Sequence, residues 1–343
     1  MPHTLPDPGP DLSIPELSIV VPVYDEAEAI APFLAALRPV LAETGLSHEI
    51  VFVDDGSRDE TARAVEAETA RDGSVKLVSF SRNFGKEAAL TAGLEWATGA
   101  AVIPIDVDLQ DPPELIRDFV RLWRAGHDIV YAERVSRAAD SRLKRLSAGL
   151  FYRLFNRISD IPIEPNVGDY RLMSRAAVEA TLALRERNRF MKGIFAWVGF
   201  PSVAVPYERP ARAAGTTKFN YWRLWNFALD GITSFTTIPL RVWTYVGLSV
   251  AAGALVYMVT ILVRTWLFGI DVPGYASIMV VMLLLGAVQL VSLGVIGEYL
   301  SRLYLEVKQR PIYYVRRSVG FGRATGEAEA DRRLDAAMRR RAG

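Results

Sequence analysis

Two acidic motifs have the residue types and the spacing that suit catalysis. Asp54-Asp55-Gly56-Ser57 follows the apolar run 49–53, and Asp106-Val107-Asp108 follows the apolar run 101–105. Carboxylates at a strand end accept hydrogen bonds from a base or a ribose. Asp106 and Asp108 would point the same way if the chain stayed extended. Two convergent carboxylates suit Mg²⁺ or Mn²⁺, which completes its shell with substrate phosphate oxygens and neutralises a leaving diphosphate. Taken alone, either motif is equally typical of a plain loop.

A cationic turn lies between the two acidic motifs. Residues 81–86 (SRNFGK) follow a third apolar run and lead into a predicted helix. Backbone N–H groups near a helix N-terminus, together with Lys86, suit a phosphate or the metal-site carboxylates. The alternative is a solvated basic turn.

Two further basic segments could contact anionic groups. Residues 134–157 include Arg134 and Arg145, with apolar residues interleaved at helical spacing. Such an amphipathic basic helix suits anionic lipid headgroups, although a core helix with a solvated basic face would look similar. The loop 208–221 contains Arg209 and Lys218 and could fold over a diphosphate. By itself this loop, like Gly168–Leu172 with Asp169, would be read as a surface loop.

The elements that must position these residues alternate along the chain. Short apolar, β-branched runs predict buried strands at 17–23, 49–53, 75–80 and 101–105. Helical patterns lie between and after them, at 26–43, 59–71, 86–97 and 112–125. Pro112 and Pro113 would occupy the first turn of the last helix. Strands alternating with helices predict an α/β domain with a mostly parallel sheet, where ligands bind at the carboxyl ends of the strands.

A different composition follows this domain. Residues 221–237 mix aromatic and charged side chains, which is typical of an amphipathic helix at a bilayer surface. Residues 242–263 and 272–297 carry no formal charge and are long enough to span a membrane. A short connector predicts a hairpin, and the basic residues outside it favour an inner-membrane protein with both ends in the cytoplasm. The alternative, a buried helical pair, is rare in soluble domains.

Composition excludes several classes of chemistry. The 343 residues include no cysteine and only three histidines, so disulfides, thiolate catalysis and Cys- or His-based metal sites are not expected. The net charge of +1 indicates no nucleic-acid partner. The predicted organisation is a flexible lead (1–16), a catalytic domain (17–220), a juxtamembrane helix (221–241), two membrane helices (242–300) and a cytoplasmic tail (301–343).

Taken together, the motifs resemble glycosyltransferase family two. They are V-P-V-Y-D-E, D-D-G-S, S-R-N-F-G-K-E-A-A, D-x-D-L-Q-D-P-P-E, G-D-Y-R-L, a Thr-Thr-Lys loop and, after the hairpin, R-P-I-Y-Y-V. More narrowly, the chain is similar to the polyprenyl-phosphate glycosyltransferases, bacterial relatives of dolichyl-phosphate mannose synthase. The resemblance covers about residues 17–315. Family members usually have Asn where this chain has Asp25, but Glu26 is retained.

The resemblance implies a GT-A (Rossmann-like) fold and an inverting hexose transfer. The donor would be a nucleotide diphosphate sugar, commonly UDP-glucose, and the acceptor polyprenyl (undecaprenyl) phosphate. By carry-over, Asp106 and Asp108 hold Mg²⁺ or Mn²⁺ at the diphosphate, and Asp108 and Asp169 are the catalytic carboxylates. The expected nucleotide-binding residues are Pro22, Tyr24, Glu26, Asp55, Lys86 and Asp106, and the expected phosphate-binding residues are Arg134, Arg145, Arg209 and Lys218.

Three alternatives and two further expectations remain. A GDP-mannose donor, a processive polysaccharide synthase and a non-enzymatic membrane scaffold are the alternatives. A processive enzyme would carry a Q-x-x-R-W motif and more spans, which the sequence lacks.

We expect a homo-oligomer, possibly a tetramer as the family suggests, because small residues in the spans let helices approach closely. The run 312–315 could add to a neighbouring copy's sheet. We also expect the lipid phosphate to attack without an essential general base, because it is already ionised.

Overall fold

The computed structural model describes residues 14–135, 167–187, 189–208, 236, 238–269 and 274–321. The chain forms two compact units. The first contains residues on both sides of the hairpin: Met1–Leu150, Ile163–Phe219 and Pro311–Gly343. The second contains Phe151–Pro162 and Asn220–Arg310. Nearly all of the predicted helix at 221–237 and of the basic stretch 134–157 lies outside the described residues.

An eight-stranded sheet in the order β7-β5-β6-β4-β1-β2-β3-β8 forms the centre of the first unit. The four predicted strands are confirmed and run parallel. They are β1 (Leu17–Val23), β2 (His48–Asp54), β3 (Val75–Phe80) and β4 (Ala101–Pro104). Their carboxyl ends therefore meet at one edge of the sheet, where the acidic motifs follow β2 and β4.

The remaining strands make the sheet mixed. They are β5 (Ile129–Arg134), β6 (Val167–Ser174), β7 (Ser202–Tyr207) and β8 (Val315–Val319). β6 runs antiparallel to both β4 and β5, and β8 runs antiparallel to β3. Because β6 is reversed, its first residues, which include Asp169, lie toward the same sheet edge as the carboxyl end of β4.

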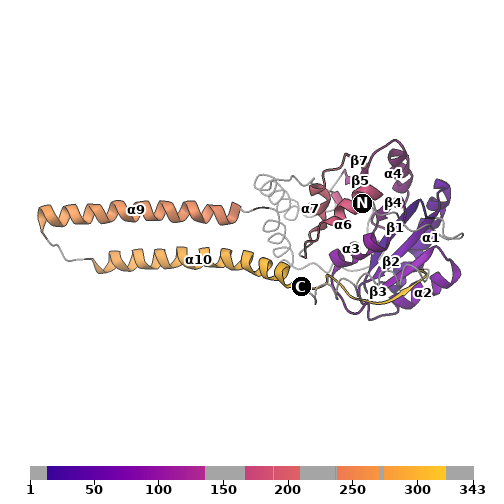
Figure 1. The fold of residues 1–343 in the computed structure, drawn as a ribbon, viewed down its shortest axis with the longest axis horizontal. Helices are drawn as coiled ribbons and strands as arrows, with labels where there is room; N and C mark the ends of the chain where they lie inside the picture. The colour runs from indigo at the N-terminus through magenta and orange to yellow at the C-terminus, as the bar shows by residue number, and fades with distance from the viewer. Residues whose placement is uncertain are drawn as a thin grey trace, which may run out of the picture. The chain divides into compact units, whose positions relative to one another are not determined.

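Helices cover both faces of this sheet (Figure 1). They are α1 (Ala27–Thr44), α2 (Thr61–Arg71), α3 (Lys86–Trp96), α4 (Leu115–Arg124), α6 (Arg175–Ala183) and α7 (Met191–Trp197). Phe33 of α1 and Phe119 of α4 are buried in the larger core with Ile19 and Phe52, whereas Ala89 of α3 packs into a second core on other strand positions. Side chains at alternate positions of each strand thus pack into the cores on opposite faces of the sheet.

One helix boundary differs from the sequence prediction. α4 begins at Leu115, so Pro112 and Pro113 precede the helix instead of forming its first turn. Their carbonyl groups accept hydrogen bonds from the amides of Leu115 and Ile116 at 3.3 and 3.0 Å. Pro112 is followed by another proline, which disfavours helical geometry at that residue. The proline pair therefore forms a turn between the second acidic motif and α4.

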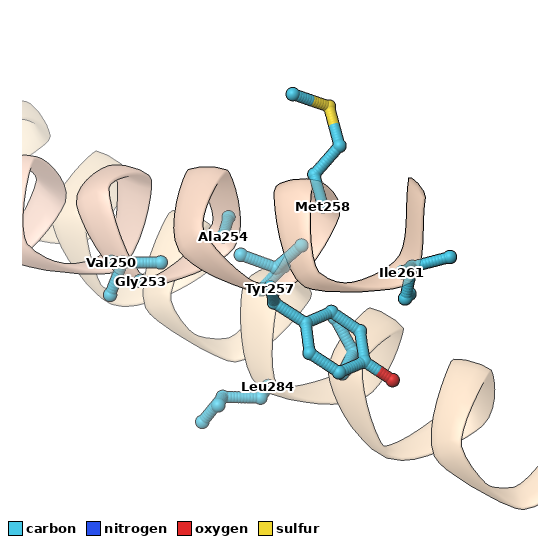
Figure 2. Close-up of a pocket in the computed structure, with 9 residues that line it drawn as sticks. Val250, Gly253, Ala254, Tyr257, Met258, Ile261 and Leu284 are labelled. Atoms are coloured by element: carbon cyan, nitrogen blue, oxygen red, sulfur yellow. The ribbon is translucent and has the colours of Figure 1, made fainter. Parts of the chain in front are cut away.

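The second unit contains the predicted hairpin. Its helices, α9 (Ile238–Phe268) and α10 (Tyr275–Lys308), are longer than the two uncharged runs and lie side by side (Figure 1). Their segments Leu240–Phe268 and Val280–Lys308 are long and apolar enough to cross a membrane. An apolar groove of about 490 Å³ is lined by side chains from both helices, including Tyr257 and Leu284 (Figure 2). Association of several copies of the chain through their hairpins stays a prediction.

The segment after the hairpin joins the sheet of its own chain. Val315–Val319 pairs with β3, from Leu77 opposite Val319 to Phe80 opposite Val315. The edge of β3 would otherwise expose unpaired backbone groups, so this pairing satisfies them within one chain. Only Val315 belongs to the run 312–315, and the addition of this run to a neighbouring copy's sheet stays a prediction.

Candidate active site

The loops after β1 and β2 are joined by hydrogen bonds. The amide of Asp25 donates to Ser57 Oγ at 3.0 Å, and the amide of Arg58 donates to Asp25 Oδ1 at 2.8 Å. Asp25 has φ of 52°, a left-handed conformation that Asp and Asn tolerate best among residues with side chains. Asp and Asn side chains also both have an oxygen that can accept the hydrogen bond from the amide of Arg58. Asp25 therefore fits a position where the family usually has Asn, and it holds Tyr24 and Glu26 beside the DDGS motif.

The two aspartates of the DDGS motif bind protein groups. Asp54 accepts hydrogen bonds from the amide of Ser57 at 2.9 Å and from Ser79 Oγ at 2.6 Å. Asp55 accepts from the amides of Phe84 and Gly85 at 2.6 and 2.9 Å. Burial raises the pKa of Asp55, although these two amides favour its charged form. Asp55, which was predicted to line a nucleotide pocket, is thus seen to anchor the loop after β3.

Gly56 allows this loop to come close. Its φ is +71°, and a Cβ atom there would lie 2.4 Å from the backbone carbon of Arg82. Real Cβ atoms do not approach backbone atoms so closely, so only glycine fits this position. The loops after β2 and β3 are therefore in direct backbone contact, and Lys86 at the end of the second loop is placed accordingly.

Lys86 brings together two carboxylates from different strands. Its Nζ lies 2.7 and 2.8 Å from the two oxygens of Asp106, after β4, and 3.0 Å from Asp169 Oδ2 on β6. Burial alone would lower the pKa of Lys86, but the two carboxylates hold it above its usual value. Burial would likewise raise the pKa of Asp169, but Lys86 lowers it to about 2. Three residues singled out from sequence therefore converge on one ion-pair cluster.

A further carboxyl group, Glu87, lies beside this cluster and was missed by sequence reasoning. Its Oε2 accepts the amide of Met191, the first residue of α7, at 3.1 Å. Burial and the negative charge of Asp169 raise the pKa of Glu87 to about 7. In the sequence, Glu87 is marked only by its position directly after Lys86. This position does not predict the hydrogen bond with Met191, which is 104 residues away.

Arg171 connects β6 to the same helix. It is buried, donates from Nη2 to the carbonyl oxygen of Gly168 at 2.8 Å, and lies 4.0 Å above the ring of Phe195 in α7. Because side chains alternate along a strand, Arg171 shares a face of β6 with Asp169. The carbonyl that it binds belongs to the residue preceding Asp169. Arg171 therefore helps to hold the backbone that carries this carboxylate.

The remaining residues that the sequence predicted for the site are not seen in the Lys86 cluster. Arg134 Nε donates to Tyr207 Oη at 3.2 Å, and Tyr207 donates to Asp111 Oδ1 at 2.7 Å. Burial and Asp111 raise the pKa of Tyr207 to about 12. Pro22 lies within β1, paired with Val53 of β2. Arg145, Arg209 and Lys218 lie outside the described residues.

Asp106 and Asp108 fit a hard divalent cation only together with substrate. Within the described ranges, no group of three or more His, Cys, Asp or Glu side chains could hold a metal ion. Mg²⁺ in nucleotide sites uses one or two carboxylates and takes its other ligands from phosphate and water. Asp108 lies in the turn after β4, where its Oδ1 accepts the amide of Gln110 at 3.1 Å. The donor set therefore suits a cation that arrives with a diphosphate.

Comparison with known proteins identifies the family of the chain. Residues 18–182 match Glycosyl transferase family 2, and residues 238–303 match the GtrB C-terminal hairpin. The chain is 52% identical over 303 residues to the SfII prophage-derived bactoprenol glucosyl transferase of Shigella flexneri, covering 88% of this chain and 98% of the relative. It is 51% identical over 302 residues to the prophage bactoprenol glucosyl transferase homolog of Escherichia coli K12, covering 88% and 99%.

Among solved structures, one similar chain is glucosyl-3-phosphoglycerate synthase from Mycobacterium tuberculosis, in complex with Mn²⁺, UDP-glucose and phosphoglyceric acid. It matches with a TM-score of 0.43 and 20% identity, over 65% of this chain and 83% of that one. The sequence matches decide the family. The chain belongs to glycosyltransferase family two, and it is an enzyme of that family with a GT-A fold and a C-terminal hairpin.

The raised pKa of Glu87 predicts a pH-dependent stability. A carboxyl group with a higher pKa in the folded state stabilises the fold below its unfolded pKa and loses this contribution as the pH rises through the folded value. For Glu87 the window runs from 4.5 to about 7. The glutamine of Glu87→Gln stays neutral at every pH, so this variant should not lose stability in the window. The free energy of unfolding of the wild type, relative to that of Glu87→Gln, should therefore fall by roughly 1 kcal/mol or more from the lower to the upper end of the window. Thermal unfolding of the detergent-solubilised protein at pH 5 and pH 8 measures the difference.

Asp169→Asn serves as the matched variant. It removes the charge that raises the pKa of Glu87, so the stability of this variant should depend less on pH in the same window. Identical pH dependence in the wild type and in Glu87→Gln would show that Glu87 does not titrate there.

Proposed function

We propose that this enzyme transfers a hexose, most simply glucose from UDP-glucose, to a polyprenyl phosphate. The proposal rests above all on the Lys86 cluster, because it brings carboxylates from β4 and β6 to one point at the ligand-binding edge of the sheet. Two relatives at about half identity are named bactoprenol glucosyl transferases, and the matches extend over nearly their whole length. The hairpin would keep such a site near a membrane-bound acceptor.

The proposed reaction is a single displacement at the anomeric carbon. The acceptor phosphate, with a second pKa of about 6, is largely ionised at neutral pH and needs no side chain to remove a proton. Its oxygen forms the bond to the anomeric carbon as the bond to the diphosphate breaks, which gives a β-linked product from an α-linked donor. Asp169, whose pKa is about 2 beside Lys86, would be a weak base. Its role in this proposal is to orient Lys86 or a sugar hydroxyl.

A divalent cation would be held by Asp106, Asp108 and the donor diphosphate. When bound, it would neutralise the charge that develops on the leaving group. Lys86 already contacts both oxygens of Asp106, so Lys86 and the cation would share this carboxylate, or Lys86 would move away from it. Candidate cations for the acceptor phosphate are Arg134, Arg145, Arg209 and Lys218.

A donor panel tests the proposed function. Purified protein in detergent should form a lipid-linked sugar when given undecaprenyl phosphate and UDP-glucose, with slower transfer from UDP-galactose or GDP-mannose. Thin-layer chromatography detects the product, and its anomeric proton coupling identifies the β linkage. Transfer only from GDP-mannose would favour the mannose-synthase alternative, and a growing polysaccharide would favour a processive enzyme.

The same assay tests the mechanism. We expect the rate of the chemical step in Asp169→Asn to keep the wild-type pH dependence, because Asp169 is ionised throughout the neutral range. An α-linked product would contradict direct attack by the phosphate. So would a rate of the chemical step that rises with pH through a single group of pKa well above 6 and loses this dependence in Asp169→Asn.

Metal dependence is a separate prediction. Asp108→Asn should lower the turnover roughly a hundredfold to a thousandfold, because stabilisation of developing charge is worth about 3–4 kcal/mol. EDTA should abolish transfer, and added Mg²⁺ or Mn²⁺ should restore it. Asp118→Asn, on the exposed side of α4, is the matched control. Near-normal turnover of a folded Asp108→Asn protein would exclude the assignment.

We also propose that both ends of the chain face the cytoplasm. Residues before and after the hairpin belong to one compact unit, and β8 pairs with β3, so the chain must return to the side from which it left. Gly269, at the end of α9, would then face the opposite side. A cysteine at this position in the naturally cysteine-free chain should react with an impermeant maleimide added to intact spheroplasts. Labelling only after membrane disruption would contradict the proposed orientation.

A further inference from the structure

The segment that follows the hairpin is bound to the loop that carries Lys86. Tyr313 comes five residues after Lys308, the last residue of α10, and β8 begins two residues later. The strand is paired with β3 as far as Phe80. Beyond this point, the amide of Ser81 donates to the carbonyl oxygen of Tyr314 at 2.9 Å. The pairing thus continues into the first residue of the loop.

Tyr313 fixes this segment to two elements beside the site. Its side chain is buried, and its ring stacks on Phe80 with centroids 4.7 Å apart and planes inclined by 17°. Its hydroxyl group donates a hydrogen bond to Glu95 Oε2 in α3. Phe80 is the last residue of β3, and Glu95 lies in the helix that begins at Lys86. Tyr313 therefore links both elements that flank the loop 81–85.

The loop is exposed at its start and bound to the protein at its end. Ser81, Arg82 and Asn83 are exposed. The amides of Phe84 and Gly85 bind Asp55, and the ring of Phe84 packs against Phe80 and Tyr314 at 5.8 and 6.4 Å between centroids. A shift of β3 relative to α3 would lengthen the bonds to Asp55 and move Lys86 away from Asp106 and Asp169.

We propose that Tyr313 is a positioning residue for glycosyl transfer, which holds the loop 81–85 and Lys86 in place through Phe80 and Glu95. The hairpin's return segment therefore completes the active site as well as the sheet. The kinetic part of this inference rests on the proposed donor, whereas the position of the loop can be measured without any substrate.

Two substitutions separate the contacts of Tyr313, and both are made in the full-length protein in detergent. Tyr313→Phe keeps the stacking on Phe80 and loses the bond to Glu95, whereas Tyr313→Ala loses both. Arg317→Ala is the matched control, because Arg317 lies on β8, the strand that follows Tyr313, and its ion pair at 2.6 Å is with Glu66 of α2, away from the loop. Hydrogen exchange of the peptide containing Phe84 and Gly85 reports the loop, and steady-state kinetics report the reaction.

We expect exchange in this peptide to accelerate in Tyr313→Ala and, to a smaller extent, in Tyr313→Phe, with no change in Arg317→Ala. The kcat/KM for UDP-glucose should fall roughly tenfold to a hundredfold in Tyr313→Ala, because small displacements of catalytic groups have effects of this size. Tyr313→Phe should recover most of this loss, and the KM for undecaprenyl phosphate should stay unchanged in both variants.

Wild-type exchange in the loop of Tyr313→Ala would overturn the proposal, as would an equal loss of kcat/KM in Arg317→Ala. If Tyr313→Ala does not fold, Tyr313→Phe decides, and wild-type exchange in that variant overturns the proposal. Absence of transfer in the wild-type protein would instead count against the proposed function, and the exchange measurement would still test the role of Tyr313.

Discussion

The contact of Lys86 with Asp106 and Asp169 is the interaction on which the site depends. The two carboxylates come from strands that are neighbours in the sheet but far apart in sequence, and both lie partly out of water. Two like charges at such a point repel each other unless a cation lies between them. Lys86 meets this requirement with distances of 2.7 to 3.0 Å. The enzyme therefore places one lysine in contact with both carboxylates.

Placing one lysine so closely requires that its loop be held from several sides. Asp55 binds two amides of the loop, and Gly56 lets the neighbouring turn touch its backbone. Tyr313 links the strand before the loop to the helix after it. These contacts come from the turn after β2 and from the segment beyond the hairpin. The candidate site is thus supported by residues from both ends of the domain, including the segment that leads into the strand after the hairpin.

The sequence predicted what depends on local pattern. The strands β1 to β4 and the helices α1 to α3 are predicted within one or two residues, because each has an uninterrupted apolar period and clear turn residues. The position of Lys86 and Asp106 at the ligand-binding edge of the sheet also followed from strand ends and motifs, whereas Asp169 was placed near the site only through the family resemblance. The partners of these residues did not follow, because they depend on pairing across long separations. Neither the reversed direction of β6, nor the bond from Met191 to Glu87, nor the stacking of Tyr313 on Phe80 leaves a periodic signal in the sequence.

The charge balance of the cluster explains why Glu87 and the proposed cation behave as they do. Asp106 and Asp169 together carry two negative charges, and Lys86 supplies one positive charge. Burial and the negative charge of Asp169 raise the pKa of Glu87, although Lys86 and Lys192 favour its charged form, so Glu87 holds its proton up to a pH of about 7. A nucleotide diphosphate would bring still more negative charge to the same point. The divalent cation proposed at Asp106 and Asp108 would offset this added charge beside a lysine that is already paired with Asp106 and Asp169.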